Sequence, residues 1–248
     1  MRNRPAKANM LYGIRAVIEA IEAGRDLERI FIQKGLKGDL IKELYNLLPG
    51  LTIPLSTVPI ERINKFTGKN HQGVVAFLSP IKYQPFEELV TSTFESGESP
   101  FFLVLDRITD VRNFGAIART AEACGVHGII IPTKNAAQVN ADAVKTSAGA
   151  LNSIPVCRVE RLSQAINFLK SSGLSTIACS EKGNQTLLGA KIELPAALIL
   201  GSEEDGISPE ILKLSDQICS IPMKGKIASL NVSAAGAIFM YEVVRQRN

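Results

Sequence analysis

The chain has 248 residues, of which 46% are hydrophobic and 21% are charged. This composition supports a packed core and excludes global disorder. No apolar run reaches the roughly 18 residues that a membrane span requires, which excludes an integral membrane protein. The basic residues 1–7 lead into no apolar signal core, so we expect a cytoplasmic location.

Positive charge is concentrated in the first third of the chain. Residues 1–80 contain 12 Lys or Arg and 7 Asp or Glu, whereas residues 81–248 contain 16 and 17. This asymmetry favours an anionic partner such as RNA. Taken alone, it is equally typical of an ordinary solvated surface.

The cysteines and histidines do not indicate a metal site. No C-x-x-C pair occurs, and each cysteine lies in or beside an apolar stretch, which is typical of buried thiols in a reducing compartment. The two histidines, His71 and His127, are too few for a histidine-rich centre. We therefore expect no bound metal.

Residues 1–80 alternate between helical and extended patterns and predict a small α/β domain. The predicted elements are a helix over 10–21, a strand over 29–32, a helix over 40–48, a helix over 58–66 and a strand over 73–78. Residues 81–100 are rich in Pro, Gly and Ser around one short helix near 86–93. That composition is typical of a linker between domains.

From residue 101 onward, apolar strands alternate with helical patterns. The predicted strands are 101–105, 128–131, 154–156, 176–179, 196–200 and 217–221, and the predicted helices are 115–123, 137–148, 162–170, 209–214 and 231–245. Strict alternation predicts a parallel sheet covered by helices on both faces. Ligands of such sheets bind beyond the carboxyl ends of the strands, so the segments after the strands are the candidate site.

The first such segment runs from Asp106 into a helix that begins near Asn113 or Phe114. Asn113 is either the cap of that helix or a binding residue. Arg119 lies among small and apolar helix residues, where a guanidinium requires a carboxylate, a phosphate or a partner subunit.

The second segment, residues 201–206, joins a buried strand to a Gly, three acids and another Gly. Glycine permits a tight turn and close approach of a ligand to the backbone. Adjacent acids repel one another, so at least one is held for a purpose, and Glu204 and Asp205 are better interpreted as loop and cap residues. No P-loop or G-x-G-x-x-G motif occurs, and a Mg²⁺ site would lack a second acidic cluster.

The third segment follows the strand over 217–221 and contains Pro222 and a basic loop before the last helix. Ser229 or Asn231 is a candidate cap for that helix. Alanine and glycine in its first turns permit close packing against another chain segment or a flat ligand.

Three motifs in these segments resemble those of the SpoU (TrmH-like) RNA 2′-O-ribose methyltransferases. They are Asn113-x-Gly115-Ala116-Ile117-x-Arg119-Thr120-Ala121, Gly201-x-Glu203-x-x-Gly206, and Ile221-Pro222-Met223 followed by Ser229-Leu230-Asn231-Val232-Ser233. Each motif is weak alone, but the ordered set spans nearly all of residues 101–247 and is highly specific. The first domain, with Asn70-His71-Gln72-Gly73-Val74, resembles the substrate-binding domain of the bacterial 23S rRNA (guanosine-2′-O)-methyltransferase subgroup. One departure is Val111, where the family often has proline.

The resemblance implies an α/β fold with a C-terminal parallel-sheet domain that contains a deep trefoil knot of the SPOUT type, preceded by a small α/β RNA-binding domain. The expected domains are thus residues 1–80 and 101–248, with the linker 81–100 between them. It also implies S-adenosylmethionine as methyl donor and a homodimer whose contact lies near the last helix. The implied cofactor-binding residues are Gly201, Ile221, Leu230, Met223 and Ser229.

By the same resemblance, the expected catalytic residues are Arg119, Glu203, Asn231 and Asn113. Methyl transfer requires the ribose oxygen, the methyl group and the sulfur to lie in line. We expect Arg119 to clamp the reacting nucleotide and to activate its hydroxyl electrostatically, because arginine is a costly general base. Glu203 and Asn231 would orient Arg119, the ribose or the cofactor, and Asn113 would hold the substrate or the loop. The sequence leaves open whether Arg119 acts in its own subunit or in the partner's.

The leading hypothesis is 2′-O-methylation of a guanosine in 23S rRNA. The alternatives are the same chemistry on tRNA and a non-catalytic RNA-binding or ribosome-assembly protein. The joint presence of Arg119, Glu203 and Asn231 argues against a pure binder. A small-molecule α/β hydrolase is disfavoured because no G-x-S-x-G nucleophile elbow occurs.

Overall fold

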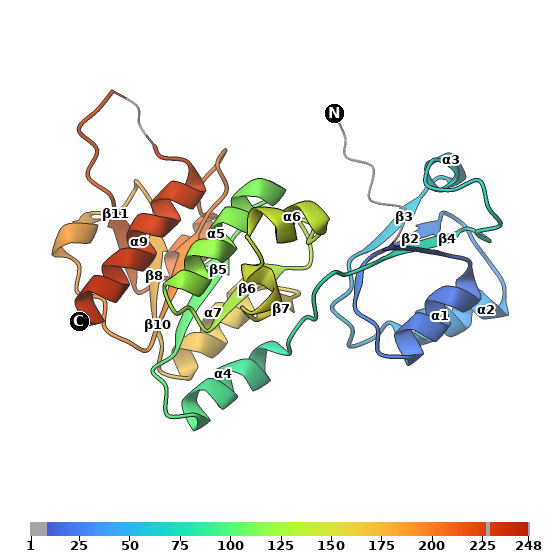
Figure 1. The fold of residues 1–248 in the computed structure, drawn as a ribbon, viewed down its shortest axis with the longest axis horizontal. Helices are drawn as coiled ribbons and strands as arrows, with labels where there is room; N and C mark the ends of the chain where they lie inside the picture. Colours follow the sequence, from blue (N-terminus) through green and yellow to red (C-terminus); the bar gives the residue numbers. More distant parts are fainter. Residues whose placement is uncertain (1–8, 227–228, 248) are drawn as a thin grey trace. The chain divides into compact units, whose positions relative to one another are not determined.

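The computed structural model describes residues 9–226 and 229–247, and the basic residues 1–7 lie outside this part of the chain. Contacts within the chain divide it into two compact units (Figure 1). The first unit comprises Met1–Lys82 with Val139–Ala141, and the second comprises Tyr83–Gln138 with Asp142–Asn248. No described helix combines the length and the apolar composition needed to cross a membrane.

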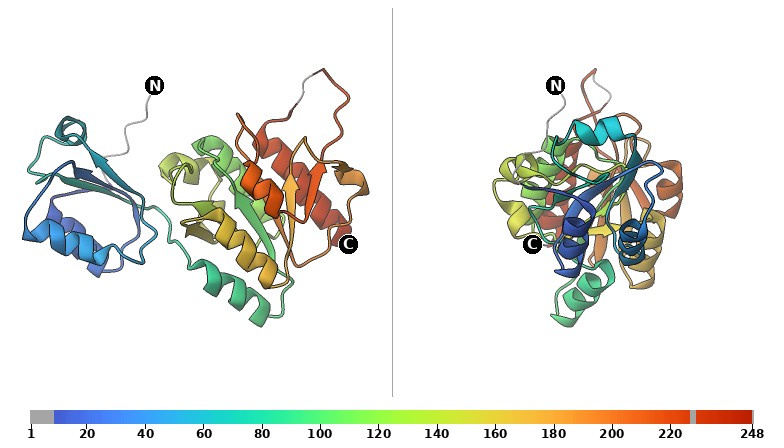
Figure 2. Two further views of the ribbon diagram at one scale, coloured as in Figure 1. Left: turned by 180° about the vertical axis from the view of Figure 1, so that it is seen from behind. Right: turned by 90° about the vertical axis from the view of Figure 1, so that its right-hand side faces the viewer.

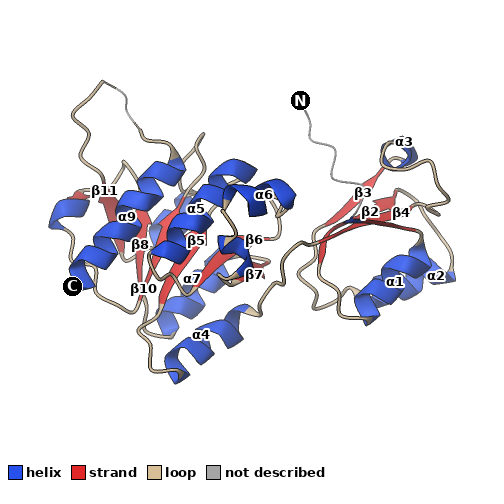
Figure 3. Ribbon diagram, viewed as in Figure 1, coloured by secondary structure: helices blue, strands red, loops and turns tan. Residues whose placement is uncertain are grey.

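The first unit is built on a mixed four-stranded sheet. Its elements are β1 (Met10–Tyr12), α1 (Ile14–Glu22), β2 (Leu27–Gln33), α2 (Asp39–Leu47), β3 (Leu55–Val58), α3 (Ile60–Asn64) and β4 (Val74–Leu78). Within the described residues the strand order is β1-β4-β2-β3, with β2 and β3 parallel and the other pairs antiparallel. The helices α1 and α2 pack on one face of this sheet and α3 on the other (Figures 1 and 3).

Two helices of the first unit begin later than the sequence predicts. Residues 10–12 form an edge strand, and Gly13, with φ of +95°, separates it from α1. The helical spacing is misleading because Leu11 enters the same core as the apolar side chains of α1. Likewise, residues 55–58 form β3, and Pro59 precedes α3.

The second unit contains a parallel sheet, as the alternation of elements predicts. Its elements are α4 (Phe86–Glu95), β5 (Phe101–Leu105), α5 (Val111–Ala123), β6 (Gly128–Pro132), α6 (Ala141–Thr146), η2 (Ala150–Asn152), β7 (Val156–Val159), α7 (Leu162–Ser171), β8 (Ser175–Cys179), β9 (Gln185–Thr186), η3 (Leu187–Gly189), β10 (Ala196–Leu200), α8 (Pro209–Leu214), β11 (Gln217–Ser220) and α9 (Val232–Arg247). In the described part of the chain the sheet has seven strands in the order β7-β6-β5-β10-β8-β11-β9, all of them parallel. The chain adds β6 and β7 on one side of β5 and the later strands on the other. The carboxyl edge between β5 and β10 is therefore a topological switch point, where sheets of this kind bind ligands.

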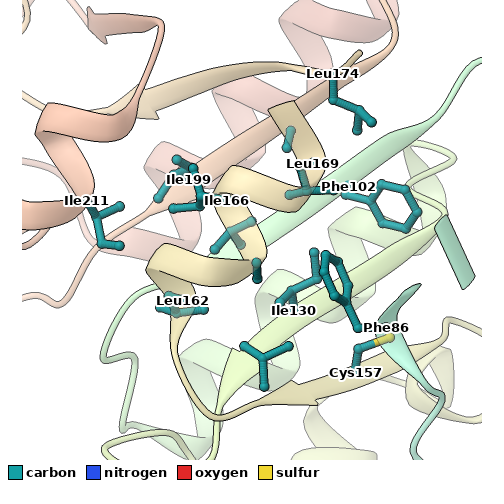
Figure 4. Packing of buried hydrophobic residues seen from close by; sticks show 14 of the residues in the cluster. Phe86, Phe102, Ile130, Cys157, Leu162, Ile166, Leu169, Leu174, Ile199 and Ile211 are labelled. Atoms are coloured by element: carbon teal, nitrogen blue, oxygen red, sulfur yellow. The ribbon is translucent and has the colours of Figure 1, made fainter. Parts of the chain in front are cut away.

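Helices cover both faces of this sheet. The helices α4, α7 and α8 pack on one face, where the core is continuous from Phe86 to Ile211 (Figure 4). The helices α5 and α9 pack together on the other face (Figures 1 and 2). Burial on both sides explains why β5 and β10 are apolar along their whole length.

The segment 81–100 differs from the expected free linker. From residue 83 onward it belongs to the second unit, and α4 buries Phe86 and Val90 in the core of that unit. These two side chains are four residues apart and therefore share one face of the helix. The Pro, Gly and Ser residues of the segment flank α4 on both sides and mark its ends.

Several other boundaries in the second unit differ from the prediction. The strand β7 covers 156–159 instead of 154–156, and α6 is shorter than the predicted 137–148. The strand β9 is too short to leave a pattern in the sequence. The strands β5 and β10 and the helix α8 have the predicted bounds.

The helix α5 begins at Val111, two residues before Asn113, and Asp110 is its cap. The Asp110 carboxylate accepts hydrogen bonds from the backbone N–H of Arg112 and of Asn113, both at 2.8 Å. The prediction that Asn113 caps the helix is therefore wrong, and its side chain is available for another partner. Val111 occupies the first helical position, which is where proline is common in helices.

Near the end of α9, Glu242 holds Gln246, and Gln246 connects the helix to Ala190 and Ile192. Its carboxylate accepts hydrogen bonds from Arg245 Nε at 2.8 Å, from Arg245 Nη2 at 2.7 Å and from Gln246 Nε2 at 2.7 Å. Gln246 also donates to the carbonyl of Ala190 and accepts from the N–H of Ile192. The hydrogen bonds from Arg245 and Gln246 lower the pKa of Glu242 from 4.5 to about 2.

This lowered pKa predicts a pH-dependent contribution to stability. A carboxyl group whose pKa is lower in the folded state stabilises the fold above its unfolded-state pKa, and the contribution is lost as the pH falls through the folded-state value. We expect E242Q to unfold at a lower urea concentration than the wild type at pH 7. The difference should narrow as the pH falls from about 4.5 toward 2, as followed by circular dichroism; a difference that does not change with pH would contradict the assignment.

Candidate active site

Asn231, directly before α9, connects the three motif segments. Its Nδ2 donates to Glu203 Oε1 at 2.6 Å and to Asn113 Oδ1 at 3.1 Å. Its Oδ1 accepts from the backbone N–H of Ser233 at 2.9 Å and from the Ser233 hydroxyl at 2.6 Å. The contact with the Ser233 N–H caps α9. One amide group therefore holds together the start of α5, the loop after β10 and the start of α9.

The loop that carries Glu203 is closed by its own backbone. Ser202 and Gly206 exchange two backbone hydrogen bonds, at 3.0 and 3.1 Å. A Cβ atom at Gly201 would overlap the backbone of Gly206 and Ile207. The sequence predicts that glycine at position 201 permits either a tight turn or the close approach of a ligand. The structure shows the tight turn directly.

Arg107 anchors this loop, although the sequence did not single it out. Its Nη1 donates to Asp205 Oδ2 and its Nη2 to the carbonyl of Gly206, both at 3.0 Å. Arg107 has φ of +59°, a conformation that costs energy in a residue with a side chain. The preceding residue, Asp106, is buried and accepts the backbone N–H of Ser208 at 2.7 Å.

The end of β5 thus fixes the loop after β10. The sequence contains one signal that could have identified Arg107 as an anchor. Asp106 and Arg107, an acid and a base, come directly after a fully buried strand. Asp205 is confirmed as a loop residue, since its carboxylate pairs with Arg107. Glu203 is the acid of the loop that faces the other two motifs.

Arg119 does not join the network of Asn113, Glu203 and Asn231 within one chain. It lies six residues beyond Asn113, about 9 Å along the helix axis. Its side chain is exposed, and it has no hydrogen bond or ion pair with any residue that the structure describes. Ile117 and Ala118 face the core and Arg119 faces solvent, so the expected phosphate or partner-subunit contact of its guanidinium stays a prediction.

The other predicted ligand residues lie in the loop between β11 and α9. Met223 and Leu230 expose 40% and 37% of their surface, and Ser229 is also exposed. Within the described residues, no backbone hydrogen bond engages Ile221, Met223 or Leu230. Exposed apolar side chains beside unpaired backbone groups suit a ligand with a flat apolar part and polar edges.

The cysteines and His127 have structural surroundings. All four cysteines are free thiols, and burial raises the pKa of Cys157 to about 12 and that of Cys179 well above its ordinary value. The His127 Nδ1 accepts the backbone N–H of Phe101 at 3.0 Å, and desolvation lowers the pKa of His127. No group of three or more His, Cys, Asp or Glu residues suited to a metal ion occurs in the described ranges.

Comparison with known proteins agrees with this arrangement. Residues 100–241 match the SpoU rRNA Methylase family, and residues 10–84 match the region described as RNA 2′-O ribose methyltransferase substrate binding. The chain is 33% identical over 236 residues to YacO of Bacillus subtilis (strain 168), which is assigned to the TrmH family of tRNA/rRNA methyltransferases; the match covers 95% of each chain. It is 34% identical to a protein of the same description from Staphylococcus saprophyticus, over 96% of each chain.

A solved structure has the same fold. The SpoU methyltransferase AviRb from Streptomyces viridochromogenes, in complex with the cofactor AdoMet, superimposes with a TM-score of 0.60 and 25% identity, over 96% of this chain and 89% of that one. The family match covers more than half of the chain, and Asn113, Glu203 and Asn231, one residue from each motif segment, meet at one edge of the sheet. The chain belongs to the SpoU family of RNA methyltransferases.

Proposed function

We propose that this protein transfers a methyl group from S-adenosylmethionine to a ribose 2′-hydroxyl of RNA, and that a guanosine in 23S rRNA is its target. The observation that carries the proposal is the hydrogen-bonded network of Asn113, Asn231 and Glu203 at the switch point of the sheet. The match of residues 10–84 to a ribose methyltransferase substrate-binding region supports RNA as the substrate. The AdoMet complex of AviRb supports the choice of methyl donor.

The loops at the carboxyl ends of β10 and β11 would hold the cofactor. Backbone groups of Ile221 and Leu230 are unpaired within the described residues, and Met223 offers an exposed apolar surface. Gly201 and Ser229 lie in the same two loops. When bound, S-adenosylmethionine supplies a methyl group that its sulfonium sulfur already activates. The trefoil knot implied for this region remains part of the proposal.

Glu203 and Asn231 would orient the reacting groups. Both hydrogens of Asn231 Nδ2 are engaged, so the amide is fixed and Glu203 Oε1 is held by it. Among the described residues, Glu203 Oε2 has no hydrogen bond. This oxygen is available to orient the ribose or a guanidinium, while Asn113 keeps the start of α5 in register.

Arg119 would bind the phosphate beside the reacting ribose. Its guanidinium is exposed on α5, and the described residues supply no carboxylate for it. An arginine in this state is suited to bidentate contact with a phosphate. Arg119 and Glu203 form no hydrogen bond or ion pair within the described residues of one chain. Arg119 could therefore act in its own subunit or in the partner subunit.

We also propose that α9 forms the contact of a homodimer. Ile238 and Tyr241 expose 42% and 67% of their surface, and they are three residues apart on this helix. Residues at this spacing share one helix face. This exposed apolar pair lies in the middle of α9, and a partner subunit bound there would lie about 10–15 Å along the helix axis from Asn231.

The enzymatic proposal is tested by incubating the purified protein with radiolabelled S-adenosylmethionine and ribosomal RNA or tRNA. We expect label in 2′-O-methylguanosine after digestion of the ribosomal RNA to nucleosides. N231D should reduce the rate at least about tenfold, because it removes the donor to Glu203 and faces that carboxylate with a second one. N167D, on the exposed side of α7, is the matched control.

The other outcomes separate the alternatives. Label in tRNA alone would identify a tRNA methyltransferase with the same chemistry. Binding of RNA without transfer, together with no heat on titration with S-adenosylmethionine, would identify a non-catalytic binder.

Replacement of Arg119 tests its role in substrate binding. R119A should abolish methyl transfer and leave the affinity for S-adenosylmethionine unchanged in calorimetric titration. The exposed Arg161 supplies the control R161A. If the activity of R119A stays within about tenfold of the wild type, equivalent to about 1.4 kcal/mol, the assigned role is wrong.

The dimer contact is tested by Y241E, measured by size-exclusion chromatography with light scattering. A buried glutamate without a partner is costly, so we expect the variant to be monomeric while the wild type is dimeric. F94E changes a half-exposed aromatic residue of α4 and should leave the dimer intact. A monomeric wild type would overturn this part of the proposal.

A further inference from the structure

The face of the first unit on which α3 packs, here called the α3 face, holds cations over aromatic rings. The Arg62 guanidinium carbon lies 5.6 Å from the centre of the Phe31 ring, and Lys69 Nζ lies 5.2 Å from the centre of the Tyr12 ring. Phe66 packs against Phe31, with ring centres 4.8 Å apart. The residues in these contacts come from β1, from β2 and from residues 62–69, and all of the contacts lie on one side of the sheet.

The strand register confirms that the two aromatic contacts share one face. Tyr12 of β1 and Phe31 of β2 are both paired with Val75 of β4, on opposite sides of it. Side chains at paired positions point to the same face of a sheet. The rings of Tyr12 and Phe31 therefore lie on the α3 face, two strands apart.

The cations of the α3 face are not neutralised by carboxylates. Arg62, Lys65 and Lys69 are exposed, and none of them forms an ion pair within the described residues. An aromatic ring restricts the position of the cation over it, and this applies to Arg62 and Lys69. The α3 face thus presents three exposed cations, two of which are held over aromatic rings.

The opposite face of the same sheet is different. On α1 and α2, Arg15 pairs with Glu43 at 3.1 Å and Lys42 pairs with Asp39 at 2.9 Å. These pairs balance the charge of that face. In residues 60–69, by contrast, the three cations Arg62, Lys65 and Lys69 accompany a single acid, Glu61, and none of the three has an ion pair within the described residues.

We propose that the α3 face is the surface on which this protein holds the sugar-phosphate backbone of its RNA substrate, with Arg62, Lys65 and Lys69 as phosphate contacts and Tyr12 as the residue that positions Lys69. The inference deepens the proposed function and rests on it. Cations held in place before binding lose less side-chain entropy when they meet a phosphate. The backbone contacts would set the position of the RNA and leave the choice of nucleotide to other residues.

The test compares two double variants with the same change in charge. R62E/K69E alters the α3 face, and R25E/K42E alters the turn after α1 and the exposed surface of α2. Binding of a fluorescein-labelled single-stranded RNA is measured by fluorescence anisotropy at several salt concentrations. We expect the dissociation constant of R62E/K69E to rise at least about tenfold more than that of R25E/K42E. The slope of log affinity against log salt should fall by about 1.4, because each phosphate contact on a single strand contributes about 0.7.

A second pair of variants tests the positioning role of Tyr12. Y12L removes the ring under Lys69 and should weaken RNA binding. Y12F keeps the ring and should bind RNA as tightly as the wild type. Y45A, at an exposed tyrosine of α2, should have no effect. The neutral double variant R62Q/K69Q repeats the test of R62E/K69E with less risk to folding. Circular dichroism verifies that each variant is folded.

The outcomes distinguish a wrong surface from a wrong function. If the wild type binds RNA and transfers methyl groups while R62E/K69E binds as tightly as R25E/K42E, the assignment of the α3 face is overturned and the proposed function stands. In that case an acidic protein is the better partner for this face. If the wild type does not bind RNA at all, both proposals are overturned. The affinity of all variants for S-adenosylmethionine should equal that of the wild type.

Discussion

The site depends on a single amide that must satisfy three chain segments at once. Asn231 donates to Glu203 and to Asn113 and accepts from Ser233, so its donors and its acceptor are all committed. An amide side chain has donors and an acceptor in a fixed plane, and neither aspartate nor serine has the same set. The loop after β10 and the starts of α5 and α9 are therefore placed relative to one another by one planar group.

The parallel sheet makes this convergence feasible. Since β5 and β10 are neighbours, the residues after both strands emerge at one edge. Arg107 and Asp106 use this proximity to fix the loop of Glu203 from the side of β5. The buried core below positions the edge, and polar contacts at the edge position Asn113, Glu203 and Asn231. Asn113 and Asn231 are 118 residues apart in the sequence, but they are joined by a single hydrogen bond at this edge.

The apolar patterns predict the fold better than they predict the polar contacts. The bounds of β5 and β10 follow from continuous apolar runs, because both strands are buried on two faces. The three motifs could be identified in the sequence, and the hydrogen bonds of Asn231 bring them together. The choice of Asp110 over Asn113 as the cap could not be predicted, since both residues are suited to this position. The clamp by Arg107 and the exposure of Arg119 depend on side-chain directions that residue spacing does not contain.

The packing of α4 determines where the second unit can be separated from the first. A fragment that starts at residue 101 would lack Phe86 and Val90 and would expose the apolar core residues against which they pack. It would also lose the backbone hydrogen bond from Gln84 to Val156 and the stacking of Arg158 on Tyr83. A fragment of the second unit must therefore start no later than residue 83 to keep these contacts.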